Sequence, residues 1–85
     1  MASVRVVFFA SLRDATGMAD CQVEANSLPV LLDKMRSMFV AEVMTALTAD
    51  NVRIAVNQQL LAGEQHDLTL QNGDEVAFLP PVTGG

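Results

Sequence analysis

The residues with the clearest chemical potential in this chain are its last two, Gly84 and Gly85. Two consecutive glycines have no side chains, so they can enter a slot in another protein that is too narrow for other residues. The α-carboxylate of Gly85 is ionised at neutral pH, because a terminal carboxyl has a pKa of about 3.5. A terminal glycine pair arises by chance in roughly one chain in two hundred. The pair alone is therefore a weak signal for a reactive tail, and its position in the chain must add to it.

The segment before the glycines gives them that position. Pro80 and Pro81 come directly after the last apolar run and cannot donate to a sheet ladder. They also restrict the conformations of the residues after them and project those residues away from the body. We therefore predict a folded domain over residues 1–79 and a flexible Gly-Gly tail over residues 80–85. Gly85 is the reacting residue, and the residues expected to insert with it are Pro80, Pro81, Val82, Thr83 and Gly84.

Chemistry at Gly85 requires activation, because a carboxylate is a poor electrophile. The usual route is attack on the α-phosphate of ATP, which forms an acyl adenylate. This chain has no phosphate-binding loop, since its glycines at 17, 63, 73, 84 and 85 match neither G-x-G-x-x-G nor G-x-x-x-x-G-K. We expect the chain to bind no cofactor itself and to be a carrier for a partner that supplies the ATP site.

Other side chains offer little chemistry. Cys21 and His66 are the sole cysteine and histidine, too few for a zinc site, and we predict no metal. A Cys–His nucleophile pair is formally possible, but Cys21 fits an inward strand position and His66 lies in a polar segment, so a structural role is favoured. The acidic residues Asp67, Asp74 and Glu75 flank a turn and fit solvated or turn-forming roles.

The composition describes one acidic domain. A chain of 85 residues, 51% of them hydrophobic, has material for a single core. Five basic and ten acidic residues give a net charge of −5, which disfavours nucleic acid and anionic membranes and favours protein partners with basic surfaces. We expect a cytoplasmic protein, because its lone cysteine suits a reducing compartment and no basic segment precedes the first apolar run. We expect no membrane span, because charged residues interrupt the apolar segment Leu28–Ala49.

The pattern of apolar residues predicts strands separated by one main helix. Ser27 is a suitable N-cap and Pro29 suits the first turn of that helix. Ser11–Gly17 is predicted to be a connector, and Ala41–Thr48 either extends the helix or forms a second one, so the break between 28–40 and 41–49 stays open. The predicted apolar face of the helix is Leu28, Leu31, Leu32, Met35 and Phe39. The predicted strands are Val4–Ala10, Ala19–Glu24 with Ala19, Cys21 and Val23 inward, Val52–Val56 and Glu75–Leu79, with Gln59–Ala62 as a continuation of the sheet.

The order strand, strand, helix, strand, strand favours an α+β fold of the β-grasp (ubiquitin-like) type. A single helix can bury its apolar face only by lying across one side of a sheet. We therefore expect a mixed sheet of four to five strands with one main helix packed across one face.

Three stretches of the sequence resemble the small, sulfur-carrier subunits of molybdopterin synthase, the MoaD family of ubiquitin-like sulfur carriers. They are Val6–Ala10 with Leu12-Arg13, Ala55–Gln58, and the closing run Asn72–Gly85, which ends in Pro-Pro-Val-Thr-Gly-Gly. The chain departs from the family where Leu79 replaces a frequent second aromatic residue and where Ala41–Asp50 is unusually apolar.

The resemblance implies a cycle of activation and sulfur transfer. An E1-like adenylating enzyme would activate Gly85 with ATP, and a sulfur donor would then convert it into a thiocarboxylate. The tail would insert into the large synthase subunit and give its sulfur to cyclic pyranopterin monophosphate, forming molybdopterin. The resemblance further implies a heterotetramer of two small and two large subunits, with the catalytic side chains on the large subunit.

Two expectations about partners remain open at this stage. Phe8 and Phe78 offer more apolar surface than four strands and one helix cover easily, so we expect them to join an interface with both partners or, alternatively, to be ordinary core. The same fold and tail also suit a sulfur carrier for thiamine or another thiolated product, a ubiquitin-like modifier attached to lysines, or a plain binding module.

Overall fold

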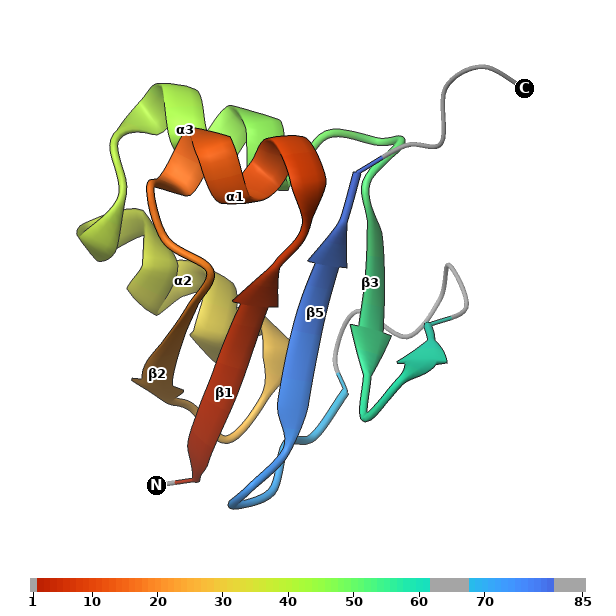
Figure 1. Cartoon of the computed structure of the whole chain (residues 1–85). Helices are drawn as coiled ribbons and strands as arrows, with labels where there is room; N and C mark the ends of the chain where they lie inside the picture. Colours follow the sequence, from red (N-terminus) through yellow and green to blue (C-terminus); the bar gives the residue numbers. More distant parts are fainter. Residues whose placement is uncertain (1, 62–67, 81–85) are drawn as a thin grey trace.

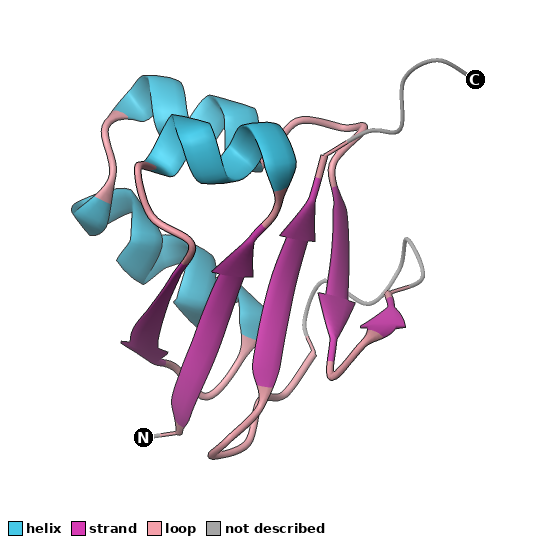
Figure 2. Ribbon diagram, in the orientation of Figure 1, coloured by secondary structure: helices cyan, strands magenta, loops and turns pink. Residues whose placement is uncertain are grey.

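The computed structural model describes residues 2–61 and 68–80 (Figure 1). This part of the chain forms a five-stranded sheet with helices on one side (Figure 2). In chain order the elements are β1 (Ser3–Phe8), α1 (Ala10–Thr16), β2 (Asp20–Glu24), α2 (Leu28–Met38), α3 (Ala41–Leu47), β3 (Arg53–Val56), β4 (Gln59–Leu60) and β5 (Glu75–Leu79).

The sheet is mixed, with the strand order β2-β1-β5-β3-β4. The two central strands, β1 and β5, run parallel, with Phe8 opposite Phe78, although they are the first and last strands of the chain. Their neighbours pair antiparallel, β2 with β1 and β3 with β5. A mixed sheet packed against helices on one face is the β-grasp arrangement that the order of elements predicted.

Apolar side chains between the sheet and the helices form the core. Alternate residues of the central strands point to the helices, and these are almost inaccessible to solvent. On α2, Leu28, Leu31 and Met35 are buried, while Leu32 and Phe39 are partly buried against the core, which confirms the predicted helix face. Buried strand residues of the core include Val4, Val6, Phe8, Val23, Val76 and Phe78. No polar or charged residue is buried in residues 2–61 and 68–80.

The local signals at the start of α2 work as expected. The Ser27 side chain accepts a hydrogen bond from the Val30 backbone N–H at 3.4 Å, and a proline stands in the first turn. The helix ends at Met38, the next residue, Phe39, has an extended backbone, and α3 begins at Ala41. Ala41–Leu47 is therefore a second helix and not a continuation of the first.

Three predictions about the first half of the chain are wrong. The connector predicted over Ser11–Gly17 is largely the helix α1, which is anchored by one buried residue, Leu12, and ends at Gly17 with a left-handed φ of 76°. The first strand ends at Phe8 and not Ala10, because Ala10 has a φ of 49° and turns the chain into α1. Ala19, predicted to face inward, is exposed and precedes β2, whereas Cys21 and Val23 do face the core side.

The helices are short. The longest described helix, α2, has 11 residues, and no helix within residues 2–61 and 68–80 is long and apolar enough to cross a membrane.

Candidate functional site

The end of β5 sets the point at which the predicted tail leaves the sheet. β5 lies between β1 and β3 and ends at Leu79, which stands opposite Arg53, the first residue of β3. Pro80, the first residue of the predicted tail, is half-buried at this edge. The chain therefore leaves from the middle of the sheet. The other tail residues, Pro81, Val82, Thr83, Gly84 and Gly85, lie outside the described residues, so their roles remain predictions.

The sheet face opposite the helices carries two rows of mostly apolar residues near this exit. The first row runs across four strands and consists of Val7, Ala77, Ala55 and Leu60, each paired in register with the next. One step nearer the end of β5, Phe9 comes after Phe8 in extended conformation, and Leu79 pairs with Arg53. We call Val7, Phe9, Ala55, Leu60, Ala77 and Leu79 the open-face patch.

The patch combines exposed and shielded surface. Phe9 and Leu60 are 45% and 56% exposed, the values expected for side chains that no other part of a domain covers. Ala55 and Ala77 are only 5% and 7% exposed, although they are not part of the core cluster. Both alanines lie in the middle of the first row, between Val7 and Leu60. A contiguous apolar surface of this kind, bordered by polar residues, is typical of a protein interaction site.

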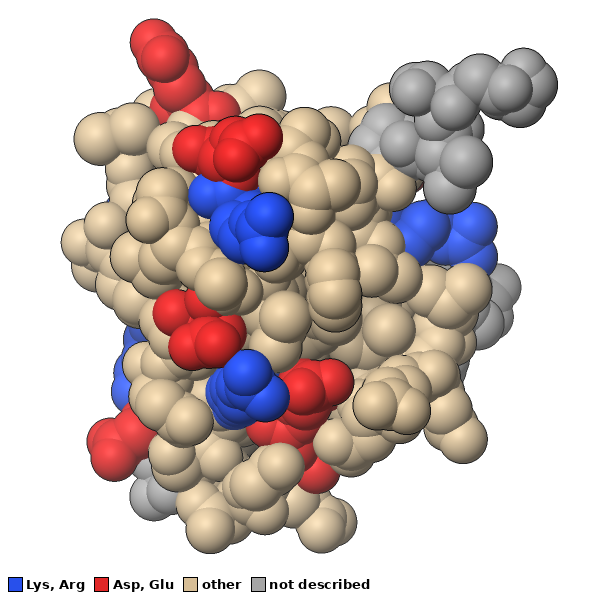
Figure 3. Space-filling view, viewed as in Figure 1, with Lys and Arg blue, Asp and Glu red and all other residues tan. Residues whose placement is uncertain are grey.

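A charged cluster borders the patch on the side away from the exit. Arg5 Nη2 lies 3.0 Å from Asp20 Oδ2, and Arg5 Nη1 lies 3.5 Å from Glu75 Oε1. The pKa of Arg5 is raised, first by the hydrogen bond to Asp20 and then by the charges of Asp20 and Glu75. Figure 3 shows opposite charges side by side on the same face as the uncharged surface. The pairs are exposed, so they contribute little stability and mainly fix the polar rim.

The β3–β4 hairpin positions Leu60 at the far end of the first row. Its two turn residues, Asn57 and Gln58, have φ values of 51° and 70°, which are the positive angles of a tight two-residue turn. The Asn57 side chain accepts a hydrogen bond from the Glu75 N–H at 3.0 Å, and its amide donates to Asp74 Oδ1 at 3.0 Å. These contacts hold the hairpin against the start of β5.

Asp74 has the turn-forming role that its position predicted. Its Oδ2 accepts a hydrogen bond from the Gln71 backbone N–H at 2.8 Å, and Gly73 in the same turn has a φ of 91°. Asp67, which was expected to act similarly, lies outside the described residues.

Of the two expectations for Phe8 and Phe78, an interface or ordinary core, their burial favours ordinary core. They are 2% and 0% exposed, and Phe8 packs edge-on to Phe39 at 5.9 Å and stacked on Phe78 at 5.8 Å between ring centroids. Both rings point to the helix side, so the isolated domain has no surface of theirs to offer. The exposed apolar residues near the exit are instead Phe9 and Leu60. Strand alternation was the available signal, because consecutive residues point to opposite faces, but only the pairing register reveals which of Phe8 and Phe9 is outside.

Cys21 has the environment of a structural thiol. It is half-buried against the core, and burial, followed by the charge of Asp20, raises the pKa of its thiol. The reactive thiolate is therefore scarce at neutral pH. His66, its formal partner in a nucleophile pair, lies outside the described residues. Within residues 2–61 and 68–80, no group of three His, Cys, Asp or Glu side chains could hold a metal ion.

These features define a ubiquitin-like, β-grasp domain whose last strand ends at Leu79, beside the open-face patch. The model of the ThiS family matches residues 6–85, and the chain belongs to this family. Among its relatives, the Escherichia coli K12 protein named molybdopterin synthase sulfur carrier subunit is 38% identical over 84 residues, covering 96% of this chain and 99% of that protein. The Haemophilus influenzae protein of the same name is 33% identical over 87 residues, covering 96% of this chain and 99% of that protein.

Solved structures agree with this assignment. The solution structure of small archaeal modifier protein 1 from Methanosarcina acetivorans has a TM-score of 0.83 and 25% identity and covers 100% of this chain and 98% of that one. A subunit in the complex of subunits 1 and 2 of the molybdopterin-converting factor from Helicobacter pylori has a TM-score of 0.70 and 25% identity and covers 98% of this chain and 99% of that one.

Proposed function

We propose that this chain is the sulfur carrier subunit of a molybdopterin synthase and that the sulfur travels on the carboxyl carbon of Gly85. The observation that carries the proposal is the arrangement at the end of β5. The last strand is central in the sheet and ends beside the open-face patch, six residues before the terminal glycine. Similarity to the Escherichia coli sulfur carrier subunit over nearly the full length of both chains supports the same conclusion.

The first chemical step is activation by an E1-like adenylating enzyme. A carboxylate oxygen of Gly85 attacks the α-phosphorus of ATP, pyrophosphate leaves, and an acyl adenylate forms. A sulfur nucleophile from a sulfur donor then attacks the acyl carbon and expels AMP, so that the tail ends in a thiocarboxylate. The chain contributes the reacting carboxyl group and its presentation, while the partner supplies the nucleotide site. We place these steps in the cytoplasm, where the lone Cys21 suits a reducing environment.

The second step takes place in the synthase. The tail residues Pro80 to Gly85 insert into the large subunit, and the thiocarboxylate sulfur displaces an oxygen substituent from a carbon of cyclic pyranopterin monophosphate, which forms a C–S bond and a thioester with Gly85. Water then hydrolyses the thioester, so the sulfur stays on the pterin and the Gly85 carboxylate is regenerated. Two such transfers supply the two sulfurs of the dithiolene of molybdopterin. Two small and two large subunits form the proposed heterotetramer, and the catalytic side chains belong to the large one. The open-face patch docks on each partner in turn, because it is the exposed apolar surface nearest the exit, with Phe9 and Leu60 as its most exposed members.

A second candidate function is conjugation to lysines of other proteins. The similarity to small archaeal modifier protein 1, with a TM-score of 0.83, favours it. Both functions use the same activated Gly85 carbonyl carbon, and they differ in whether a sulfur or a lysine amine attacks it.

Mass spectrometry of the intact chain tests the proposal. The purified protein is incubated with the adenylating enzyme, ATP and a sulfur donor, and the terminal peptide is then sequenced by fragmentation. We expect one terminal oxygen of Gly85 to be replaced by sulfur, and no replacement when ATP is omitted. Conjugates through lysine without any thiocarboxylate would favour the modifier, and a chain unchanged under all conditions would contradict both functions.

A further inference from the structure

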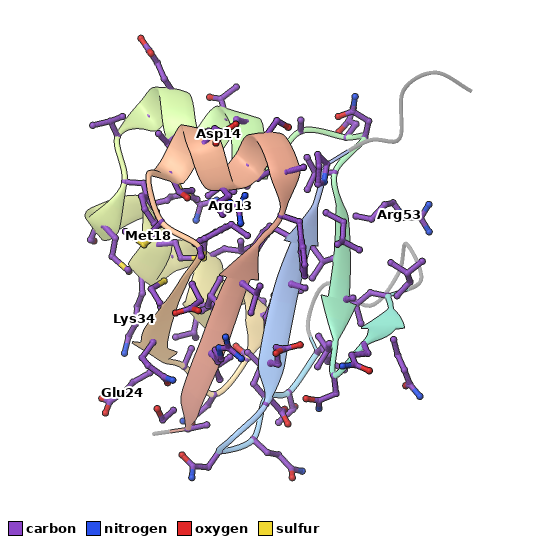
Figure 4. The ribbon with its side chains drawn as sticks, viewed as in Figure 1. Arg13, Asp14, Met18, Glu24, Lys34 and Arg53 are labelled. Atoms are coloured by element: carbon purple, nitrogen blue, oxygen red, sulfur yellow. The ribbon has the colours of Figure 1, made fainter. Side chains whose placement is uncertain are left out.

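One basic side chain stands on the docking face beside the tail exit. Arg53 begins β3 directly opposite Leu79, so its side chain belongs to the same row as Phe9 and Leu79. The residue is exposed, and Figure 4 shows its guanidinium pointing away from the body of the domain near the point where β5 ends. Figure 3 shows a basic group at this margin of the uncharged surface.

Arg53 differs from Arg5 and Arg36, each of which lies beside a carboxylate. Arg5 lies 3.0 Å from Asp20, and Arg36 lies 3.9 Å from Asp33. No carboxylate in residues 2–61 and 68–80 makes an ion pair with Arg53, although the chain carries a net charge of −5 and acidic residues outnumber basic ones two to one. An acidic domain thus presents a cation at the edge of the open-face patch.

We propose that Arg53 is a specificity-determining residue that pairs with a carboxylate of the synthase large subunit when the open-face patch docks. This inference rests on the proposed function. A guanidinium presents two parallel N–H groups to a carboxylate, so such a pair fixes orientation as well as contributing attraction. The position suits the task, since the rim of an interface is polar and its charges select the right partner and register. Correct rotation of the domain on its partner would in turn direct the tail into its slot.

The competing role for Arg53 is to hold the phosphate of the adenylated tail. An extended segment of six residues, 80–85, spans about 20 Å, far beyond the reach of an arginine side chain at its base. A phosphate joined to Gly85 and bound in a partner's slot would therefore be out of reach, whereas a carboxylate on the partner's surface beside the slot would not. The geometry favours the partner carboxylate.

Binding measurements with matched variants test the pairing. The wild-type chain, Arg53→Gln, Arg53→Glu and the control Arg36→Glu are titrated against the large subunit at low and high salt. Arg36 is suitable because it is also exposed, lies on α2 on the helix side and gives the same change in net charge. We expect Arg53→Gln to raise Kd roughly two- to fivefold, the size of an exposed ion pair, and Arg53→Glu to raise it roughly tenfold by adding like-charge repulsion. Arg36→Glu should change Kd less than about twofold, and the Arg53 effects should shrink at high salt.

Cross-linking identifies the partner group directly. In an Arg53→Lys variant, carbodiimide treatment of the complex should join position 53 to a large-subunit aspartate or glutamate, located by mass spectrometry. Lys34 is the only other lysine of that chain, so the background is small. The matched Arg36→Lys variant should give no cross-link at position 36.

The outcomes separate the pairing from the proposed function. A wild-type chain that does not bind the large subunit at all would overturn the proposed function. If the wild-type chain binds the large subunit but Arg53→Glu and Arg36→Glu change Kd equally, or neither changes it, the pairing alone would be overturned. Weakened binding of Arg53→Glu to the adenylating enzyme, with the large subunit unaffected, would overturn the choice of partner.

Discussion

The two faces of the sheet receive residues from the same strands but bury them to different extents. Phe8 and Phe9 are neighbours in sequence, yet Phe8 is 2% exposed beneath the helices and Phe9 is 45% exposed on the open face. The same contrast holds on β5, where Phe78 is fully buried and Leu79 is half-buried beside the exit. The helix-covered face therefore holds the domain together, and we propose that the apolar surface left on the open face serves recognition.

The largest loss of stability is expected from a substitution at Met35, on the helix-covered side of the sheet. Its side chain is fully buried, and among the described residues no buried polar or charged residue lies near enough to pair with a new charge. Met35→Asp should lower the free energy of unfolding by about 3–5 kcal/mol, a large share of the stability of a small domain. Urea denaturation followed by circular dichroism measures this. A variant with the wild-type midpoint would show that α2 does not pack as described.

The adjacent phenylalanines sharpen the comparison. Phe8→Ala should cost about 3–5 kcal/mol of unfolding free energy because a buried ring is lost, whereas Phe9→Ala should cost less than about 0.5 kcal/mol. Binding to the large subunit should respond in the opposite way, with Phe9→Ala raising Kd roughly tenfold, or about 1.4 kcal/mol. Thermal melts and calorimetric titration of the two variants measure both effects. If Phe9→Ala binds as the wild type does, the open-face patch is not the docking surface.

The smallest expected effect lies in the turn of the β3–β4 hairpin, whose two residues, Asn57 and Gln58, are exposed. Gln58 has a φ of 70°, a conformation that costs a residue with a Cβ but not glycine. Gln58→Gly should therefore stabilise the domain by about 0.5 kcal/mol, after allowance for the freedom that glycine gains when unfolded. The control is Gln59→Gly, one residue later in β4 and without a positive φ, which should destabilise. Equal effects of the two changes in urea denaturation would contradict the turn geometry.

The sequence predicted most of the sheet and α2 because those elements leave strong local patterns. Alternation marked Cys21 and Val23, and a capping serine followed by apolar residues at helical spacing marked α2. The helix α1 left no such pattern, since it has one buried residue and its N-cap, Phe9, makes no side-chain cap. The break between α2 and α3 at Phe39 and Val40 also left no signal in the sequence, because neither glycine nor proline interrupts the apolar run there.

The candidate site was predictable only in part. The tail was evident from Gly84 and Gly85 themselves, and their roles remain predictions. For Phe8 and Phe78 the sequence left an interface and ordinary core both open, and their burial favours the core. The exposed large apolar residues of the open face are Phe9 and Leu60. Which side of each strand faces the helices depends on pairing between β1, β5 and β3, whose residues lie far apart in sequence, and a local pattern cannot provide that information.

Deletion of Gly85 tests the central claim most directly, because it removes the reacting carboxyl from its position without altering either face of the sheet. Molybdopterin formation is reconstituted from cyclic pyranopterin monophosphate with the large subunit, the adenylating enzyme, ATP and a sulfur donor, and the unfolding midpoint of the same preparation is recorded. A displacement of about 1 Å can cost on the order of a hundredfold in rate, so a one-residue deletion should abolish product. A chain with one residue added after Gly85 is the companion variant and should fail in the same way, and both should unfold at the wild-type midpoint. Full product from the chain lacking Gly85 would contradict the account.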